Sequence, residues 1–176
     1  MNINQQSTEF DEYFTYLKTR SRIGSFYRKF YLYPLLNNYL DGKVIDVGCG
    51  LGDFIKYRKN TVGVDVNPRI VEFCQKNSLN VSLIKDQNLH FDNNSFDGVI
   101  MDNVLEHITN PKRILNEVNR ILNKNGILVI GVPGIKGYQK DPDHKIFYSD
   151  EKLSNDISLY GFELIKIVKT PLSMRF

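Results

Sequence analysis

The stretch Val44-Ile-Asp-Val-Gly-Cys-Gly-Leu-Gly-Asp-Phe54 decides the fold that we expect for this chain. Its apolar start carries an acid, Asp46, and leads into three glycines spaced two residues apart, Gly48, Gly50 and Gly52. Glycine allows a sharp turn and a close approach to a ligand because it has no Cβ. A second acid, Asp65, ends the next apolar run. Open α/β sheets bind ligands at the carboxyl ends of their strands, so this pattern predicts a ligand site there.

The glycine spacing separates two kinds of ligand. Dinucleotide-binding sites carry G-x-G-x-x-G, with an acid about 20 residues further on. Here the spacing is G-x-G-x-G, and Asp53 occupies the position of a third glycine, where a carboxylate would crowd and repel a pyrophosphate. The segment Asp46–Gly52, together with Asp65, instead resembles the class I S-adenosylmethionine (SAM)-dependent methyltransferases. SAM has no phosphate and tolerates the acid.

The resemblance extends over roughly residues 44–169. Phe96–His107 resembles the family's fourth strand and its Leu-Glu-His signature, and Pro111–Gly126 resembles the following helix and turn. His144–Gly161 resembles the stretch leading into the last helix. The chain looks most like the small-molecule methyltransferases of the ubiquinone/menaquinone-biosynthesis type. This resemblance implies an α/β fold, a three-layer α/β/α Rossmann-like sandwich with a mostly parallel sheet, and SAM as the cofactor.

Strand and helix patterns alternate after the first forty residues, as in a parallel sheet. We expect strands at 43–47, 61–65, 81–84, 97–102, 126–132 and 162–169, and helices at 52–59, 68–77, 111–122 and 150–160. Residues 1–42 are expected to form a helical N-terminal cap, interrupted near Gly24 and at Pro34, and residues 43–176 a single SAM-binding methyltransferase domain. The family's final antiparallel strand has no evident counterpart. Either this strand is missing, the chain is shortened, or a partner supplies the edge, and an open sheet edge there would favour a homo-oligomer.

For SAM, the resemblance implies a role for each strand end. Asp46 would help to hold the amino acid end, the glycine turn would approach the ligand, and Asp65 would accept both ribose hydroxyls. Asp86 would meet the adenine amine with help from the Gln87 amide, although an acid there also suits the start of a turn. Met101 or Asp102 would lie near the methionine part. The expected cofactor-binding residues are Asp46, Gly48, Cys49, Gly50, Gly52, Asp65, Val66, Asp86, Gln87, Met101 and Asp102.

Three side chains are candidates for a general base, namely His144, His107 and Tyr148. His144 follows the fifth predicted strand, where the family often places acceptor-facing residues, whereas His107 could equally serve a structural hydrogen bond. The neighbouring acids and His107 could suggest a Mg²⁺ site. Because Glu106 and His107 belong to the ordinary signature of metal-free relatives, we expect no metal.

Composition limits the other functions. The net charge of +3 is too mild to indicate nucleic acid binding by itself, and no apolar run approaches the ~20 residues of a membrane span. Cys49 and Cys74 lack metal-type spacing, so a reducing, cytoplasmic setting fits best. Residues 13–40 contain five basic and many aromatic residues but no acid. This segment could form a lid over SAM, bind an anionic acceptor or membrane surface, or simply pack its aromatic rings on the sheet.

The sequence therefore predicts an enzyme, a SAM-dependent methyltransferase that acts on a small molecule, at oxygen, with a sugar or glycan precursor favoured. Two alternatives stay open. The chain could bind SAM as a non-catalytic or partner subunit, or it could methylate RNA or protein. We expect no stable nucleic acid partner, because Met101-Asp-Asn-Val104 stands where many nucleic-acid methylases carry an Asn- or Asp-Pro-Pro-Tyr tetrapeptide.

Overall fold

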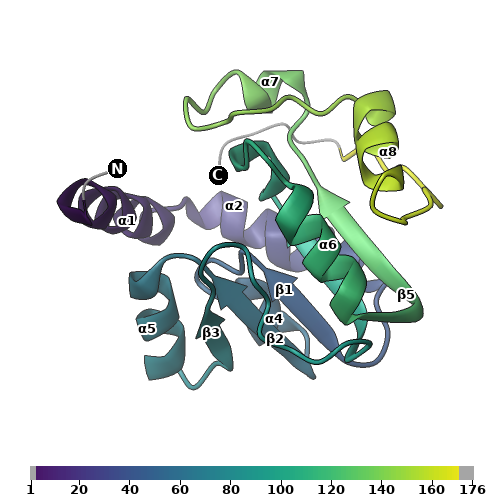
Figure 1. Ribbon diagram of the computed structural model, residues 1–176. Helices are drawn as coiled ribbons and strands as arrows, with labels where there is room; N and C mark the ends of the chain where they lie inside the picture. The colour runs from purple at the N-terminus through teal and green to yellow at the C-terminus, as the bar shows by residue number, and fades with distance from the viewer. Residues whose placement is uncertain (1–2, 171–176) are drawn as a thin grey trace.

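Residues 3–170 of the computed structural model form a five-stranded sheet with helices on both faces (Figure 1). The strands lie in the order β3-β2-β1-β4-β5, and each is parallel to its neighbours. Their bounds are β1 Val44–Val47, β2 Thr61–Asp65, β3 Val81–Leu83, β4 Phe96–Asp102 and β5 Leu122–Gly131. The expected α/β/α sandwich with its parallel sheet is confirmed. The strand order reverses between β1 and β4, which places a topological switch point beside the glycine turn.

The N-terminal segment is helical, but its main break differs from our prediction. The elements are α1 Ile3–Lys18, α2 Arg22–Tyr27, a π-helical turn η1 Arg28–Leu32, and α3 Tyr33–Asn37. The break falls at residues 19–21, and the prediction of a break near Gly24 is wrong. Ser21 begins α2 because its Oγ accepts a hydrogen bond from the Gly24 amide at 3.1 Å, which leaves Gly24 buried inside the helix. Pro34 lies in the first turn of α3, as expected.

The four helices predicted between and after the strands are confirmed, with slightly different bounds. They are α4 Asp53–Tyr57, α5 Pro68–Lys76, α6 Lys112–Ile121 and α8 Asp150–Ser158. Two short elements were not predicted, the 3-10 turn η2 Leu105–His107 and the helix α7 Ile135–Tyr138. Elements of three or four residues are too short to produce a hydrophobic period that could be recognised in the sequence.

The alternation of side chains along the strands divides the core into two layers. Ile45 and Val47 of β1 belong to the cluster that packs against α6, where Ile114, Leu115, Val118 and Ile121 are buried. Val44 belongs to a second cluster with residues of α3 and α4. Figure 1 shows α6 on the near face of the sheet and α2 behind it. Because successive side chains of a strand point to opposite faces, Asp46 and Asp102 lie on the face of the N-terminal helices.

The predicted strand at 162–169 is wrong. Residues 162–170 form no strand, and the side chains from Glu163 onward are exposed, with Ile165 at 80%. This segment is held by other contacts: Lys169 pairs with Asp150, and the Lys166 ammonium lies 5.5 Å from the centre of the Tyr39 ring. Within the described residues β5 is therefore the last strand of the sheet. The expectation that a final strand is missing also falls on residues 171–176, which lie outside the described residues.

The start of β5 also differs from the prediction. β5 begins at Leu122, four residues before the expected position 126. Its register shifts there, since Leu122 pairs with Phe96 and Ile127 with Gly98. The residues between loop out, and Asn125 adopts a left-handed φ of 68°. The Asn125-Gly126 turn thus exists, but inside the strand rather than before it. Within residues 3–170, no helix combines the length and apolar character that crossing a membrane would require.

Candidate functional site

The turn after β1 needs glycine for two reasons. Gly48, Gly50 and Gly52 all have left-handed φ values, of 76°, 51° and 71°. A Cβ on Gly48 would lie 2.6 Å from Val104 Cγ2, and one on Gly52 would lie 2.5 Å from Leu79 Cδ1. Gly50 differs, because a Cβ there would meet only Leu17 Cδ1, at 3.6 Å. Close packing therefore requires glycine at the two outer positions, whereas the backbone conformation alone requires it at Gly50.

Asp65, at the end of β2, ties the glycine turn to the next loop. Its Oδ2 accepts a hydrogen bond from the Gly50 amide at 3.0 Å, and its Oδ1 accepts one from the Asn67 amide at 2.9 Å. Burial raises the pKa of Asp65, and the amides of Asn67, Gly50 and Val66 oppose that rise. The carboxylate is thus fixed by backbone donors. Val66, in contrast, is 52% exposed.

Two further acids lie on the face of the N-terminal helices. Burial raises the pKa of Asp46 well above its usual range, and the carboxylates of Asp102 and Asp65 raise it further. Burial also raises the pKa of Asp102, while the guanidinium groups of Arg28 and Arg20 lower it. Such crowding of acids disfavours the charged forms unless a cation binds. SAM carries two cationic groups, a sulfonium and an ammonium, so this group of carboxylates suits it.

A cavity of about 1150 Å³ connects these acids with the loop after β5. Eight of the predicted site residues line it, namely Asp46, Gly48, Cys49, Gly50, Asp102, His107, His144 and Tyr148. Gly52, Asp65, Val66, Asp86, Gln87 and Met101 are not part of this lining. Met101 is fully buried in the core on the α6 face, because it alternates with Asp102 along β4. Cys49 is buried, and its sulfur lies 3.7 Å from the Gly50 carbonyl oxygen.

The N-terminal helices form one wall of the cavity. The lining residues from this segment include Tyr13, Tyr16, Arg20, Tyr27, Arg28, Tyr33 and Tyr39. The Arg20 Nε is buried and has no hydrogen-bond partner among the described residues. The sequence showed that basic and aromatic residues concentrate here, but it did not show which of them face the site.

Contacts with the β2–α5 loop place α1 across the glycine turn. The Asn67 side chain donates to the Phe10 carbonyl oxygen at 2.8 Å, and Arg69 pairs with Asp11 at 2.7 Å. Leu17 is 1% exposed and packs in a cluster with Cys49 and residues of α4 and α5. Asn67 also caps α5, as predicted, by accepting from the Arg69 amide at 2.9 Å. No sequence pattern indicated its second bond to α1.

Asp86 and Gln87 occupy a tight turn after β3. Both have left-handed φ values, of 51° and 55°, and the Asn88 amide donates to the Lys85 carbonyl oxygen at 3.0 Å. Two positive φ values in succession are those of a type I′ turn. The Gln87 side chain accepts from the Ile114 amide at 3.2 Å and so contacts α6. Asp86 is exposed.

The three candidate bases lie at the other end of the cavity, with two histidines in contact. The ring centres of His107 and His144 are 4.8 Å apart. His144 Nδ1 lies 2.9 Å from the Tyr138 carbonyl oxygen, and His107 Nδ1 lies 3.1 Å from Asp143 Oδ2. The loop is held here because the Glu106 carbonyl oxygen accepts from two of its amides, those of Lys145 at 2.6 Å and Ile146 at 3.1 Å.

Glu106 is a member of this cluster that the sequence did not select. It is 0% exposed, and neither of its carboxylate oxygens has a hydrogen-bond partner among the described residues. Burial raises its pKa to about 8, its own backbone amide opposes that rise, and the carboxylates of Asp102 and Asp141 add to it. Tyr148 is 5% exposed, and burial, together with the carboxylates of Asp156 and Glu106, raises its pKa to about 12. A hydroxyl with that pKa is a poor base near neutral pH.

Comparison with known proteins assigns the class. Residues 45–130 match the family described as a methyltransferase domain. This span includes the glycine turn, Asp65 and the whole of β4. This match, together with the fold, supports a class I SAM-dependent methyltransferase that uses SAM as its cofactor.

Three relatives illustrate the range of the family. An uncharacterised protein of Methanocaldococcus jannaschii is 27% identical over 140 residues, which cover 73% of this chain and 68% of that protein. A ubiquinone/menaquinone biosynthesis C-methyltransferase of Campylobacter jejuni is 31% identical over 51% of this chain and 44% of its own. A Mus musculus protein named "Probable tRNA methyltransferase 9B" is 31% identical over 51% of this chain, but only 21% of its own length is covered.

Solved structures share the fold. A SAM-dependent methyltransferase of Thermotoga maritima superposes with a TM-score of 0.67 at 24% identity, covering 89% of this chain and 78% of its own. A Haloferax volcanii protein solved together with a methyltransferase activator gives a TM-score of 0.73 at 18% identity, with 90% and 78% covered. At these identities the likeness extends to the fold alone.

Proposed function

We propose that the protein transfers a methyl group from SAM to a hydroxyl of a small molecule bound at the His107–His144 end of the cavity. The observation that carries this proposal is the single cavity of about 1150 Å³. It joins the glycine turn and the acids Asp46 and Asp102 to the two histidines. Donor and acceptor would thus share one cavity, and aligning two reactants can lower a barrier by ~7–11 kcal/mol.

The donor end of the cavity, formed by the glycine turn with Asp46 and Asp102, would bind SAM through groups of opposite charge. Asp46 and Asp102 would face its cationic centres, and Asp65, adjoining the Gly50 backbone, would accept the ribose hydroxyls. Arg20, whose buried Nε has no partner among the described residues, would bind the carboxylate of SAM. Residues 1–42 would then act as a cap that closes over the cofactor. The adenine contact is assigned to the Asp86-Gln87 turn.

The acceptor end of the cavity, formed by His107 and His144, would activate the hydroxyl of the small-molecule acceptor. SAM, when bound, supplies an electrophilic methyl group on a sulfonium. Because a carbonyl oxygen can only accept, the His144 Nδ1 must donate to Tyr138, which leaves Nε2 as the basic nitrogen. This nitrogen would take the proton of the acceptor hydroxyl, a role that contributes roughly 10²–10⁴-fold in rate. His107 would orient the acceptor beside it.

We favour a sugar or glycan precursor as the acceptor, including an anionic one. This choice is supported by the cap, because Arg28 also lines the cavity and its guanidinium can attract a phosphate or carboxylate of the acceptor. Hydroxyl groups on a polar ring also suit a site lined by tyrosines and histidines.

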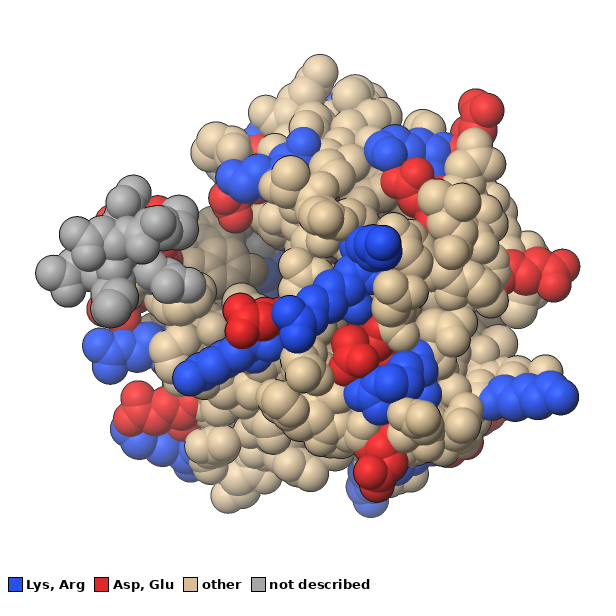
Figure 2. Space-filling model, in the orientation of Figure 1, with Lys and Arg blue, Asp and Glu red and all other residues tan. Residues whose placement is uncertain are grey.

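Methylation of RNA is the second candidate. It is favoured by the basic segment around Arg20 and by the tRNA methyltransferase among the relatives. Against it, Figure 2 shows acidic side chains beside the basic ones on the visible face, including next to the diagonal row of basic side chains at its centre. A steep loss of RNA affinity between low and moderate salt would support this candidate.

Calorimetric titration with S-adenosylhomocysteine (SAH), with NAD as the control ligand, tests the proposal first. We expect micromolar binding of SAH alone. Transfer of labelled methyl from SAM across a panel of hydroxylated acceptors then tests catalysis. Absence of SAH binding would contradict the donor site. Tight SAH binding without turnover on any acceptor would favour a non-catalytic SAM-binding subunit.

A further inference from the structure

The Glu106 carboxylate lies in an environment that does not suit a carboxylate by itself. It is 0% exposed, and both of its oxygens lack a hydrogen-bond partner among the described residues. The nearest cationic candidate is His144, whose Nε2 lies 3.9 Å from Oε1, beyond hydrogen-bond distance. An unpaired buried charge is costly, so this group requires a cation or a proton.

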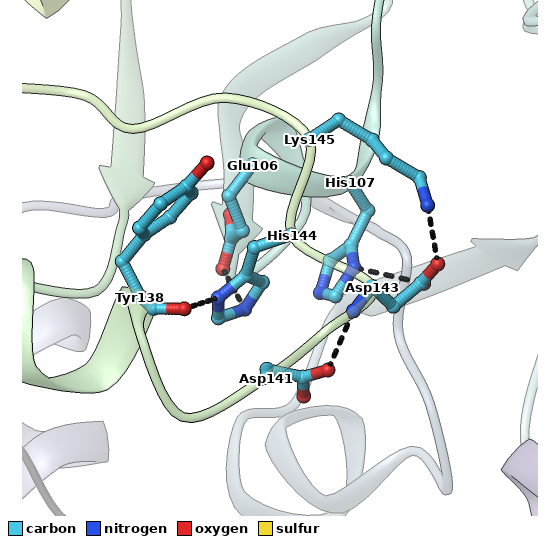
Figure 3. A network of polar contacts seen from close by, with 7 residues as sticks. All are labelled: Glu106, His107, Tyr138, Asp141, Asp143, His144 and Lys145. Carbon is cyan, nitrogen blue, oxygen red and sulfur yellow. Dashed lines mark hydrogen bonds and ion pairs between the residues drawn. The ribbon is translucent and has the colours of Figure 1, made fainter.

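The two neighbouring histidines present the nitrogens that a metal would need. Each uses Nδ1 as a donor, His144 to the Tyr138 carbonyl oxygen and His107 to the Asp143 carboxylate. When the rings are neutral, Nε2 of each is therefore left with its lone pair. Metal-binding histidines almost always show this arrangement, in which the second nitrogen donates to a carbonyl or carboxylate that fixes the ring. Figure 3 shows Glu106, His107 and His144 side by side, with Tyr138 and Asp143 on their outer sides.

We infer that Glu106, His107 and His144 bind a divalent transition-metal ion of the zinc class. One ligand atom from each residue lies within 4.8 Å of the other two. Ligands at the usual Zn²⁺ bond lengths of ~2.0–2.2 Å would be roughly 3.4 Å apart in a tetrahedron, so only small side-chain shifts are needed. Two imidazoles and one carboxylate suit Zn²⁺, Fe²⁺ or Co²⁺, whereas Mg²⁺ and Ca²⁺ prefer oxygen ligands.

Three protein ligands leave a fourth position open, as in catalytic zinc sites. His107 and His144 line the cavity while Glu106 lies buried behind them, so the open position faces the acceptor end. This inference deepens the proposed function and rests on it. A hydroxyl bound to the ion would lose its proton to water, and the cation would stabilise the resulting oxygen anion. His144 would then act as a ligand rather than as the base itself.

Metal binding can be tested without an acceptor or a methyl-transfer assay. The full chain, without a polyhistidine tag, is treated with EDTA, dialysed and titrated with ZnCl₂ by calorimetry. Co²⁺, followed by its visible absorption, reports the ligand geometry. We expect one Zn²⁺ per chain with a dissociation constant below 1 μM (about −8 kcal/mol), and no comparable binding of Mg²⁺.

Matched variants locate the site. Glu106→Gln and His144→Ala should each weaken Zn²⁺ binding at least 100-fold, and Asp143→Ala roughly 10–100-fold, because it orients a ligand. His90→Ala changes an exposed histidine and should bind Zn²⁺ like the unmodified protein. Circular dichroism establishes that each variant is folded. Glu106→Gln preserves side-chain volume, so it stays informative if His144→Ala does not fold.

The results separate the metal from the methyl transfer. Failure of the unmodified chain to bind Zn²⁺, or equal binding by the Glu106→Gln and His144→Ala variants, overturns the inference. Preferential binding of Mg²⁺ overturns it as well. SAH binding measured on the same samples reports the donor site by itself. SAH binding without Zn²⁺ binding would leave the proposed function standing and remove the metal, while Zn²⁺ binding without SAH binding would do the reverse.

Discussion

Asp65 and Glu106 are both buried acids at the carboxyl edge of the sheet, but their surroundings are opposite. Asp65 accepts hydrogen bonds from the backbone amides of Gly50 and Asn67. Glu106 accepts none within the described residues, and its carboxylate lies within 4.8 Å of ring nitrogens of His107 and His144. The first acid is stable in place before any ligand arrives. The second acid requires a proton or a cation, and we infer that a metal ion supplies the charge.

The difference follows from how the two ends of the cavity are built. The donor end is made of backbone amides and glycines at fixed strand ends, which are rigid and pre-organised. The acceptor end depends on the loop between β5 and α8, held to η2 by the amides of Lys145 and Ile146. The donor end can thus serve one cofactor throughout a family, whereas a loop can vary and set the acceptor.

The largest effect that we expect is on turnover, at the acceptor end. His144→Ala should lower kcat at least 100-fold on an acceptor found in the panel, while the dissociation constant for SAH changes less than threefold. The reason is that His144 contacts the acceptor region and not the glycine turn. Initial rates with labelled SAM measure kcat, and His90→Ala is the matched control. Full activity of His144→Ala would exclude His144 as base and as essential ligand.

At the donor end, Asp65→Ala should weaken SAH binding tenfold or more (roughly 1.4 kcal/mol or above). The variant loses the acceptor for the ribose hydroxyls and releases the Gly50 amide. Calorimetry measures the affinity, and Asp92→Ala, at an exposed loop position, is the control. An unchanged affinity in a folded Asp65→Ala variant would remove Asp65 from the ribose site.

The geometry of the glycine turn and of the acids Asp46 and Asp65 was largely predictable because its signals are local. Strand, glycines and acids follow one another within residues 44–65, and each residue type has a backbone reason to be there. Asn67 and Pro68 likewise marked the start of α5 correctly. Met101 shows the limit of this reasoning, since the choice between it and Asp102 depends on strand register, and the structure places its side chain in the core.

The acceptor end was only partly predictable because its contacts are distant in sequence. His144 lies 38 residues from Glu106, and nothing between them indicates that they meet. Glu106 was interpreted as part of a family signature, although its lack of a partner is visible only in three dimensions. The strand expected at 162–169 failed for a related reason. Its apolar and β-branched residues suit a strand locally, but a strand also needs a neighbour to pair with.

Asp46 sharpens the comparison, because we propose that the bound cofactor supplies part of its environment. Burial raises its pKa well above 3.8, so the folded apoprotein holds its proton more tightly than the unfolded chain. Above pH 4 this difference makes stability fall as pH rises toward the raised value. Asp46→Asn removes the titration, so the melting temperature of the variant, relative to the unmodified protein, should increase between pH 4 and pH 7.5.

We expect the difference in melting temperature between the Asp46→Asn variant and the unmodified protein to widen by a few degrees, since 1 kcal/mol corresponds to about 2–4 °C for a domain of this size. Thermal melts at pH 4, 5.5 and 7.5 without ligand measure it. The same variant should bind SAM more weakly, because the cofactor loses a counter-charge. A melting-temperature difference that stays constant with pH would mean that Asp46 is not held at a raised pKa.

The smallest effect concerns the Asp86-Gln87 turn, where a structural role and an adenine contact compete. Asp86 has a φ of 51°, which glycine adopts without strain. Asp86→Gly should therefore preserve the turn, or stabilise the protein slightly, while removing the carboxylate. If the carboxylate binds the adenine amine, SAH affinity falls by about three- to tenfold, the value of one hydrogen bond, and the melting temperature is unchanged or higher. An unchanged affinity would assign Asp86 to the turn alone. Lys85→Ala, also exposed and next to the turn, is the control for charge changes nearby.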